Sequence, residues 1–409
     1  MKVRTNTIDE KANSPKRQKK RIALVANSSW YTYNFRLGLL KRLREEGFEV
    51  YVLAPKDHYS TRLIAEGYHF INLPIGIYSQ NPFSELVIIL QLIRLYRKYR
   101  FSLIFHYTAK PNIYGTLAAA CCRIPSIAIT TGLGLLRDPG KRLARFSLLA
   151  LYRIAARFTR ELWFLNQDDL QFFLERKVVR REKAFVLPSE GVDIDWFRPV
   201  ESSPLPAARA TTRFLYAGRI VWSKGIREFY EAARYFKERG AKVSFEMVGF
   251  IVPEHPDGVS YELVEQWNQQ GIIRYHGETE DIRPFLAEAD CLLLPSYFGE
   301  GVPRILLEAA SMGCPIITTD HVGCREVVEH GRNGLLCRPK DSSSLIGAME
   351  FFLSLGQEER YQMGREGRKG VLKRFDEEII VNNYLIAISR LLKWRIKVPA
   401  KENINTPSS

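Results

Sequence analysis

Two glutamates, Glu300 and Glu308, lie in the segment EGVPRILLE, between a strand-like run and a helical pattern. Gly301 sits at the intervening turn, and Pro303 suits the first turn of a helix, where its missing N–H is not needed. The N–H groups of such a helix start, aided by the helix dipole, form a site for an anion such as a diphosphate.

The spacing of the two glutamates fits a particular ligand. Glu308 is expected about two helical turns beyond Glu300, roughly 9–10 Å away at 1.5 Å per residue. This span matches the separation of the sugar and the ribose in a nucleotide sugar, so each carboxylate could accept hydrogen bonds from one of them. The alternative is a helix-capping acid and a solvated surface acid. The neighbouring glycines and the strand–turn–helix context favour the nucleotide sugar.

Two cations occur in the segment AGRIVWSKG at 217–225, directly after another strand-like run. Arg219 offers a planar fork to phosphate oxygens, and Lys224 offers a point charge. Both could neutralise a leaving diphosphate. Either residue alone is more often a surface cation, so the prediction depends on its combination with the glutamates.

Polar side chains also follow the strand-like runs of the first half. The turn within 26–40 is not a glycine-rich phosphate loop, but it is suited to an acceptor that carries phosphate or sugar hydroxyls. His106 has a structural alternative, as a histidine at the end of a strand. The candidate acceptor residues are Asn27, Ser28, Tyr33, Asn34, Arg36, His106, Lys110, Thr131 and Gly132.

The elements that must position these residues follow a βαβ pattern. Alternating strand-length runs and helical patterns are typical of parallel sheets covered by helices. Helices are expected at 34–46, 224–238 and 376–394. Strands are expected at 21–27, 49–55, 101–106, 125–130, 161–165 and 183–187, and again at 213–218, 242–249, 272–277, 291–296, 314–319 and 334–339.

The pattern predicts an α/β protein with two Rossmann-like doubly wound domains. A proline-rich stretch at 191–208 is the expected linker. Ligands in such folds bind at the carboxyl ends of the strands, which here would face an inter-domain cleft. The remaining predicted units are a disordered basic tail at 1–20, a first domain at 21–190, a second domain at 209–375, a helix returning to the first domain at 376–396 and a disordered tail at 397–409.

Charge is unevenly distributed along the 409 residues, whose net charge is +15. Residues 21–190 hold 25 Lys and Arg against 13 Asp and Glu, whereas residues 191–409 have a net charge of −2. The first half therefore indicates an anionic partner, such as a membrane surface, a lipid-linked phosphate or a nucleic acid. A solvated basic surface is the alternative. Scattered basic residues on a Rossmann-like scaffold disfavour nucleic acid.

Two segments, 92–101 and 140–161, combine arginines with an apolar stripe that includes Leu143 and Phe146. This pattern is typical of a basic amphipathic helix at a membrane surface, although a helix packed on a sheet with a solvated arginine face would look similar. The tail at 1–20 lacks the apolar core of a signal peptide, and no run reaches the ~18 residues of a membrane span. Any membrane contact is therefore expected to be peripheral.

The sequence gives no indication of a metal site or of disulfides. The six cysteines form no C-x-x-C pair and are expected to be buried reduced thiols of a cytosolic protein. Asp193 and Asp195 formally match a D-x-D metal motif, but they lie in the predicted linker and are interpreted as a turn. No cofactor is expected, and activity is expected to be independent of metal.

On these motifs the chain resembles family 4 of the GT-B glycosyltransferases, the retaining group. The family's Glu–seven residues–Glu motif matches Glu300 and Glu308, and its Arg and Lys match Arg219 and Lys224 in GRIVWSKG, a loop one residue shorter than in some members. The segments 276–290 and 319–341 are also similar to the family. The resemblance covers about residues 20–395 and implies Arg219, Lys224 and Glu300 as catalytic residues. It implies donor contacts from Gly218, Glu278, Gly301, Val302, Pro303, Arg304, Ile305 and Glu308.

The first half is similar to bacterial enzymes that add an N-acetylated hexose to an undecaprenyl-diphosphate-linked sugar, N-acetylgalactosaminyltransferases above all. This implies a UDP-sugar donor and a cytoplasmic enzyme held peripherally at the inner face of the cell membrane. Many members have a histidine where this chain has Thr130, Thr131 and Gly132, which leaves His106 as the nearest substitute. The alternatives are a nucleotide-sugar epimerase of the same fold and a glycosyltransferase with a soluble acceptor.

Overall fold

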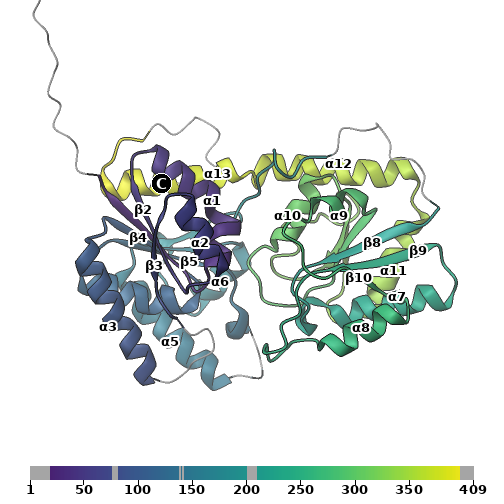
Figure 1. Cartoon of the computed structure of the whole chain (residues 1–409), viewed down its shortest axis with the longest axis horizontal. Helices are drawn as coiled ribbons and strands as arrows, with labels where there is room; N and C mark the ends of the chain where they lie inside the picture. The colour runs from purple at the N-terminus through teal and green to yellow at the C-terminus, as the bar shows by residue number, and fades with distance from the viewer. Residues whose placement is uncertain (1–18, 76–81, 138–139, 141, 200–209, 397–409) are drawn as a thin grey trace, which may run out of the picture.

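The computed structural model describes residues 19–75, 82–137, 140, 142–199 and 210–396. The chain forms two α/β halves that lie side by side, and each is built on its own parallel sheet (Figure 1). The predicted fold class is therefore confirmed.

Seven parallel strands form the first sheet, in the order β3-β2-β1-β4-β5-β6-β7. The central strands β4 and β5 are buried along their whole length, because helices cover both faces. The order reverses between β1 and β4, and such a reversal opens a crevice at the carboxyl edge. The strands are β1 (Arg21–Val25), β2 (Glu49–Ala54), β3 (His69–Asn72), β4 (Leu103–Tyr107), β5 (Ser126–Thr130), β6 (Glu161–Phe164) and β7 (Ala184–Val186).

Helices cover both faces of this sheet. On one face α4 packs against both α3 and α5, and on the other α1 packs against α2 and α13. A short π-helical turn, Pro111–Gly115, precedes α4. The helices are α1 (Ser29–Glu45), α2 (His58–Ala65), α3 (Pro82–Tyr99), α4 (Thr116–Cys121), α5 (Arg142–Phe158) and α6 (Gln167–Glu175), with one-turn 3-10 helices at Gly134–Arg137 and Arg181–Lys183.

Six parallel strands form the second sheet, in the order β10-β9-β8-β11-β12-β13, with the reversal between β8 and β11. The strands are β8 (Thr212–Ala217), β9 (Val243–Val248), β10 (Arg274–Tyr275), β11 (Cys291–Leu294), β12 (Ile316–Thr319) and β13 (Leu335–Cys337). The helices are α7 (Ile226–Glu238), α8 (Tyr261–Gln269), α9 (Arg283–Glu288), α10 (Arg304–Ser311) and α11 (Ser342–Ser354), with a 3-10 helix at Trp222–Lys224.

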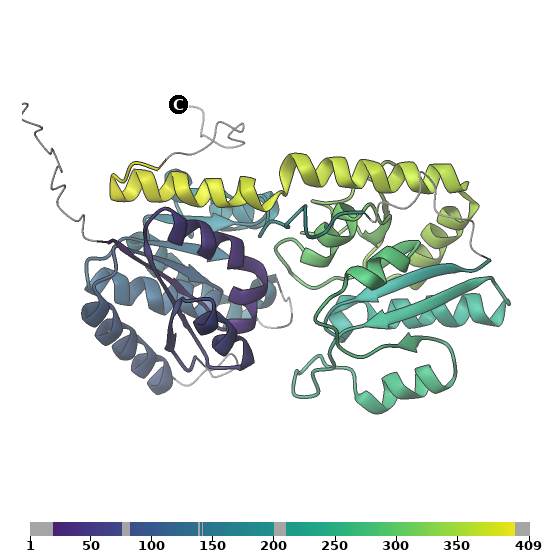
Figure 2. The same cartoon turned by 45° about the horizontal axis from the view of Figure 1, so that its top comes forward.

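Two consecutive helices run along one side of the molecule and connect its two halves (Figure 2). α12 (Gln357–Arg374) covers the half with the second sheet, and α13 (Glu377–Leu392) covers the half with the first sheet. The helical conformation is interrupted between them. Asp376 caps the second helix, because its carboxylate accepts a hydrogen bond from the Glu378 N–H at 3.0 Å. α13 packs on α1, and the hydroxyls of Tyr107 and Tyr384 lie 3.3 Å apart.

The structure corrects some predicted elements. α1 begins at Ser29 rather than at Asn34, because the Ser28 hydroxyl caps the helix by accepting from the Tyr31 N–H at 3.3 Å. One strand and several helices were not predicted, namely β3, α2, α6, α8, α11 and α12. The tails at 1–18 and 397–409 and the linker residues 200–209 lie outside the described residues.

The cysteines were predicted to be buried thiols, and the D-x-D segment was predicted to be a turn. All six cysteines are free and four of them are buried as predicted, whereas Cys122 is half-buried and Cys121, the last residue of α4, is exposed. Asp193 accepts from the N–H groups of Asp195 and Trp196 at 3.0 and 2.8 Å. This confirms the turn.

Candidate active site

Three loops meet closely at the carboxyl edge of the second sheet, after β8, β9 and β10. The Gly218 N–H donates to Val248 at 3.0 Å, and the Gly249 N–H donates to Gly277 at 2.8 Å. A Cβ on Gly249 would lie 1.8 Å from the Gly218 oxygen, so only glycine permits this approach. The close approach fixes the start of the loop that carries Arg219.

Lys224 and Glu300 form an ion pair at this edge. Lys224 ends the 3-10 helix after β8, its side chain is 9% exposed, and it contacts Glu300 Oε1. The Ser296 hydroxyl donates to the same oxygen at 3.3 Å. The two predicted catalytic residues are therefore together, and they neutralise each other.

Arg219 lies on the same loop as Lys224, and its guanidinium is 5.9 Å from the ring centroid of Phe298. Phe298 belongs to the loop that carries Glu300, and its carbonyl accepts from the Glu300 N–H at 2.8 Å. The structure thus places the three predicted catalytic residues on two facing loops. One arginine and one lysine beside a single carboxylate give this site a net positive charge.

Glu308 lies inside α10 and is paired with a predicted donor residue. Arg304 Nε donates to Glu308 Oε1 at 3.0 Å. Burial raises the pKa of Glu308, and the Arg304 guanidinium opposes this shift. Arg304 also reaches the first domain, where it lies 4.9 Å from the Phe35 ring centroid. Arg304 therefore lies between the predicted ribose-binding carboxylate and α1.

The two domains touch at Gly301. Its N–H donates to the Thr131 carbonyl at 3.1 Å, and its carbonyl accepts from Asn166 Nδ2 at 3.1 Å. The Gly134 N–H donates to Gly299 at 3.0 Å. In this arrangement the first domain occupies the Gly301 N–H, which lies just before the helix start that was predicted to bind a diphosphate. Thr131, a predicted acceptor residue, thus lies directly against the loop that carries Glu300 and Gly301.

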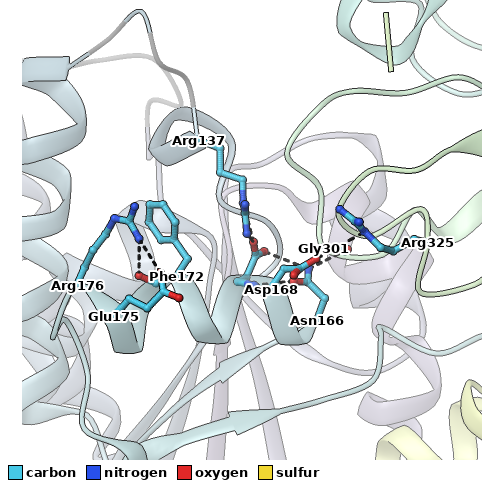
Figure 3. Close-up of polar contacts among 9 residues, drawn as sticks. Arg137, Asn166, Asp168, Phe172, Glu175, Arg176, Gly301 and Arg325 are labelled. Atoms are coloured by element: carbon cyan, nitrogen blue, oxygen red, sulfur yellow. Dashed lines mark hydrogen bonds and ion pairs between the residues drawn. The ribbon is translucent and has the colours of Figure 1, made fainter. Parts of the chain in front are cut away.

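Charged contacts surround this junction (Figure 3). The Asp169 carboxylate accepts from Arg137 Nη2 at 2.8 Å and from Asn166 Nδ2 at 3.1 Å. Arg325 reaches across from the second domain to Asp168, with Nε and Oδ2 3.7 Å apart. The start of α6 therefore contacts the Gly301 loop together with the loop after β5.

Replacing Gly132 by alanine is expected to separate the two loops. Gly132 has φ 132°, and its Cβ would lie 2.7 Å from the Gly299 carbonyl oxygen and 2.8 Å from the Gly301 nitrogen. We expect a larger radius of gyration in solution scattering. The control is Gly134→Ala, which has φ 39° and no atom within 4 Å of its Cβ. Equal scattering from G132A and the wild type would contradict this expectation.

Arg36, a predicted acceptor residue, is buried instead of facing the cleft. Its side chain is 2% exposed and pairs with Glu190, 5% exposed, at 2.6 Å. The guanidinium lies 3.7 Å from the Tyr107 ring centroid and 4.4 Å from that of Tyr31. Because α1 begins five residues earlier than predicted, position 36 lies in its second turn instead of at the helix start. Arg36 therefore ties α1 to the segment that follows β7.

His106 is also a core residue. It is fully buried, its Nε2 lies 3.0 Å from the Tyr96 hydroxyl and its Nδ1 lies 3.3 Å from the Thr116 hydroxyl. Burial lowers the pKa of His106 to about 3, so the ring is neutral at physiological pH. This corrects its prediction as an acceptor residue, since both ring nitrogens are engaged inside the fold.

The other predicted residues lie in segments that follow the carboxyl ends of strands. Asn34 is exposed on α1, Asn27 and Tyr33 are half-buried, and Glu278 is exposed after β10. Lys110, after β4, pairs with Glu85 at 2.7 Å. Among the predicted donor residues, Gly301, Val302 and Pro303 are buried and Ile305 is half-buried.

Several residues of this region were not predicted. Ser296 supports Glu300, and Asn166 holds Gly301 across the domain junction. The Nδ1 of His321, after β12, is buried without a hydrogen-bond partner among the described residues. Ser296 is the last residue of the predicted strand 291–296, which is a usable signal. The Asn166 contact joins residues 135 apart in sequence, and no local pattern indicates it.

Comparisons with known proteins match both halves of the chain. A model described as glycosyl transferase 4-like matches residues 21–166, and one described as glycosyl transferases group 1 matches residues 211–354. The N,N'-diacetylbacillosaminyl-diphospho-undecaprenol alpha-1,3-N-acetylgalactosaminyltransferase of Campylobacter jejuni is 29% identical and covers 91% of this chain and 99% of its own.

Two further proteins are more distant. The UDP-Gal:alpha-D-GlcNAc-diphosphoundecaprenol alpha-1,3-galactosyltransferase of Escherichia coli is 23% identical over 75% of this chain and 80% of its own. The crystal structure of HepE from Anabaena in complex with UDP superposes with a TM-score of 0.73 at 19% identity, covering 90% of this chain and 100% of that one. With two facing parallel sheets and both halves matched, the chain belongs to the group 1 glycosyltransferases of family 4, enzymes of the GT-B fold that transfer sugars.

Proposed function

We propose that this enzyme transfers an N-acetylhexosamine from a UDP-sugar to a sugar carried on a polyprenyl diphosphate, with retention at the anomeric carbon, in cell-surface glycan assembly. The observation that carries the donor half is the Lys224–Glu300 pair beside Arg219, facing the Thr131 loop of the first domain. The acceptor half is supported by the names of the Campylobacter and Escherichia relatives, and the UDP donor by the HepE complex.

The cations stabilise the diphosphate as it leaves. Arg219 and Lys224 would meet the negative charge that develops on it, which is usually the largest contribution to catalysis. Lys224 would then exchange Glu300 for a phosphate oxygen. The freed Glu300 carboxylate can accept hydrogen bonds from hydroxyls of the donor sugar, and Glu308 can accept them from the ribose. The departing phosphate itself would assist attack by the acceptor on the same face.

A panel of UDP-sugars tested against polyprenyl-diphosphate sugars, with the product read by mass, tests this proposal. We expect one N-acetylhexosamine to be added to a lipid-linked sugar. Transfer only to free saccharides would overturn the lipid-linked acceptor. Conversion of the donor in an incubation without acceptor would instead indicate an epimerase.

A surface for the lipid is offered by α3 and α5. Among the described residues no helix has the length and hydropathy to cross a bilayer. α5 packs on the domain through Tyr152, Ala155 and Ala156, yet leaves Leu143 81% exposed and Phe146 70% exposed. Arginines flank this patch, and α3 exposes further apolar and basic residues beyond α4, namely Leu86, Val87, Leu90, Arg94, Arg97 and Lys98. Exposed apolar side chains among basic ones fit an anionic membrane surface.

Replacing Leu143 and Phe146 together by serine is expected to weaken binding to phosphatidylglycerol vesicles at least tenfold, since burying each side chain contributes about 1.5–3 kcal/mol. Cosedimentation measures the effect. The control is Ile64→Ser, because Ile64 is 56% exposed on α2, on the other face of the sheet. Equal vesicle binding by the double variant and the control would remove this surface from the proposal.

A further inference from the structure

The loop after β4 has an unusual backbone. Thr108 has φ 70°, a left-handed conformation that a β-branched residue rarely adopts. The next turn, Pro111–Gly115, is π-helical rather than α-helical. Strained residues and π-helical turns cluster at functional sites. Both features lie within residues 108–115, directly after β4, which makes the side chains around this segment candidates for a functional role.

Two buried oxygens beside this loop have no hydrogen-bond partner among the described residues: Glu85 Oε2 and Thr108 Oγ1. Glu85 comes from the first turn of α3, its side chain is 10% exposed, and its other oxygen accepts from Lys110 Nζ at 2.7 Å. The helix dipole explains an acid in a first turn. It does not explain an unpartnered oxygen, which is unfavourable when buried.

The position of this cluster is the acceptor side of the cleft. In the sheet Tyr107 lies opposite Ile129, so Thr108 leaves β4 beside the end of β5. Neighbouring strands are about 4.8 Å apart. The loop after β5 contains Thr131, which contacts the Gly301 loop. The cluster is therefore one strand away from the junction with the catalytic loop.

The charge of the cluster indicates whether it would bind the diphosphate or the sugar of a lipid-linked sugar. Glu85 neutralises Lys110, so the pair is poorly suited to a diphosphate, which needs net positive charge. A carboxylate oxygen can accept a hydrogen bond from a sugar hydroxyl, and a threonine hydroxyl can donate or accept one. We propose that Glu85, Lys110 and Thr108 bind the sugar of the acceptor, with Glu85 Oε2 accepting from one ring hydroxyl. This inference rests on the proposed function.

The test compares Glu85→Gln with wild type on a short-chain polyprenyl-diphosphate N-acetylhexosamine and its monodeoxy analogues. We expect the acceptor KM of E85Q to rise about 10–100-fold, since a hydrogen bond to a charged group contributes about 1.5–3 kcal/mol. For one deoxy analogue, E85Q and wild type should have equal KM, because the hydroxyl in question is missing. Glu45→Gln, an exposed acid on α1, is the control.

A purely structural ion pair predicts a different pattern. In that case E85Q/K110M, which removes both charges, would recover the acceptor KM, whereas a sugar-binding role predicts that it stays high. UDP affinity measured by calorimetry shows whether each variant is folded. An unchanged acceptor KM in folded E85Q, or recovery in the double variant, overturns the inference alone. Absence of transfer by wild type to any lipid-linked sugar overturns the proposed function together with it.

Discussion

Replacing Lys224 by alanine is expected to lower kcat about 10²–10³-fold, the usual loss when one preorganised group that stabilises developing negative charge is removed. The side chain is 9% exposed and is held against Glu300, so its position before the reaction is already fixed. Without it, Arg219 alone faces the departing diphosphate, and Glu300 adds an unbalanced negative charge beside it. The measurement is kcat for product formation at saturating donor and acceptor.

The controls separate chemistry from folding. Lys242→Ala removes an exposed lysine of the same domain and should keep the wild-type kcat. Lys224→Arg keeps the charge and should recover part of the rate, although its planar fork does not reproduce a point charge. A kcat of K224A within threefold of wild type, with an unchanged melting temperature, would contradict the place of Lys224 at the leaving group.

The donor side of the site could be predicted because its signals are local. Glu300 and Glu308 lie in one strand–turn–helix segment, and Arg219 and Lys224 lie in one loop after β8. The α/β fold was equally accessible, since each buried parallel strand is a short apolar run. What local pattern did not indicate is the pairing within the site. Lys224 forms an ion pair with Glu300, and Arg304 forms one with Glu308.

The acceptor side was harder because its contacts join distant segments. Arg36 and Glu190 are 154 residues apart, and the prediction of Arg36 as a cleft residue depended on a helix start that was placed too late. Each helical residue advances about 1.5 Å along the helix axis, so a start five residues earlier places position 36 deeper in the fold than the prediction assumed. Net positive charge indicates an anionic partner, but it does not tell which arginines face it.

Replacing Arg36 by alanine is therefore expected to destabilise the first domain rather than to weaken acceptor binding selectively. It leaves Glu190, 5% exposed, without its cationic partner, and among the described residues the Tyr31 hydroxyl, at 2.9 Å, still donates to it. Breaking a buried pair in this way costs about 3–5 kcal/mol. For a domain of this size we expect the melting temperature to fall by about 10 °C. Calorimetry or urea unfolding measures the effect.

Two variants test the physical reason. Arg36→Met combined with Glu190→Gln leaves no buried charge, so it should be more stable than Arg36→Ala. Arg42→Ala removes a 33% exposed arginine of the same helix, which pairs with Glu46 at 3.0 Å, and should cost under about 1 kcal/mol. If Arg36 instead bound the acceptor phosphate, R36A would keep the wild-type melting temperature and raise only the acceptor KM. That result would return Arg36 to the acceptor site.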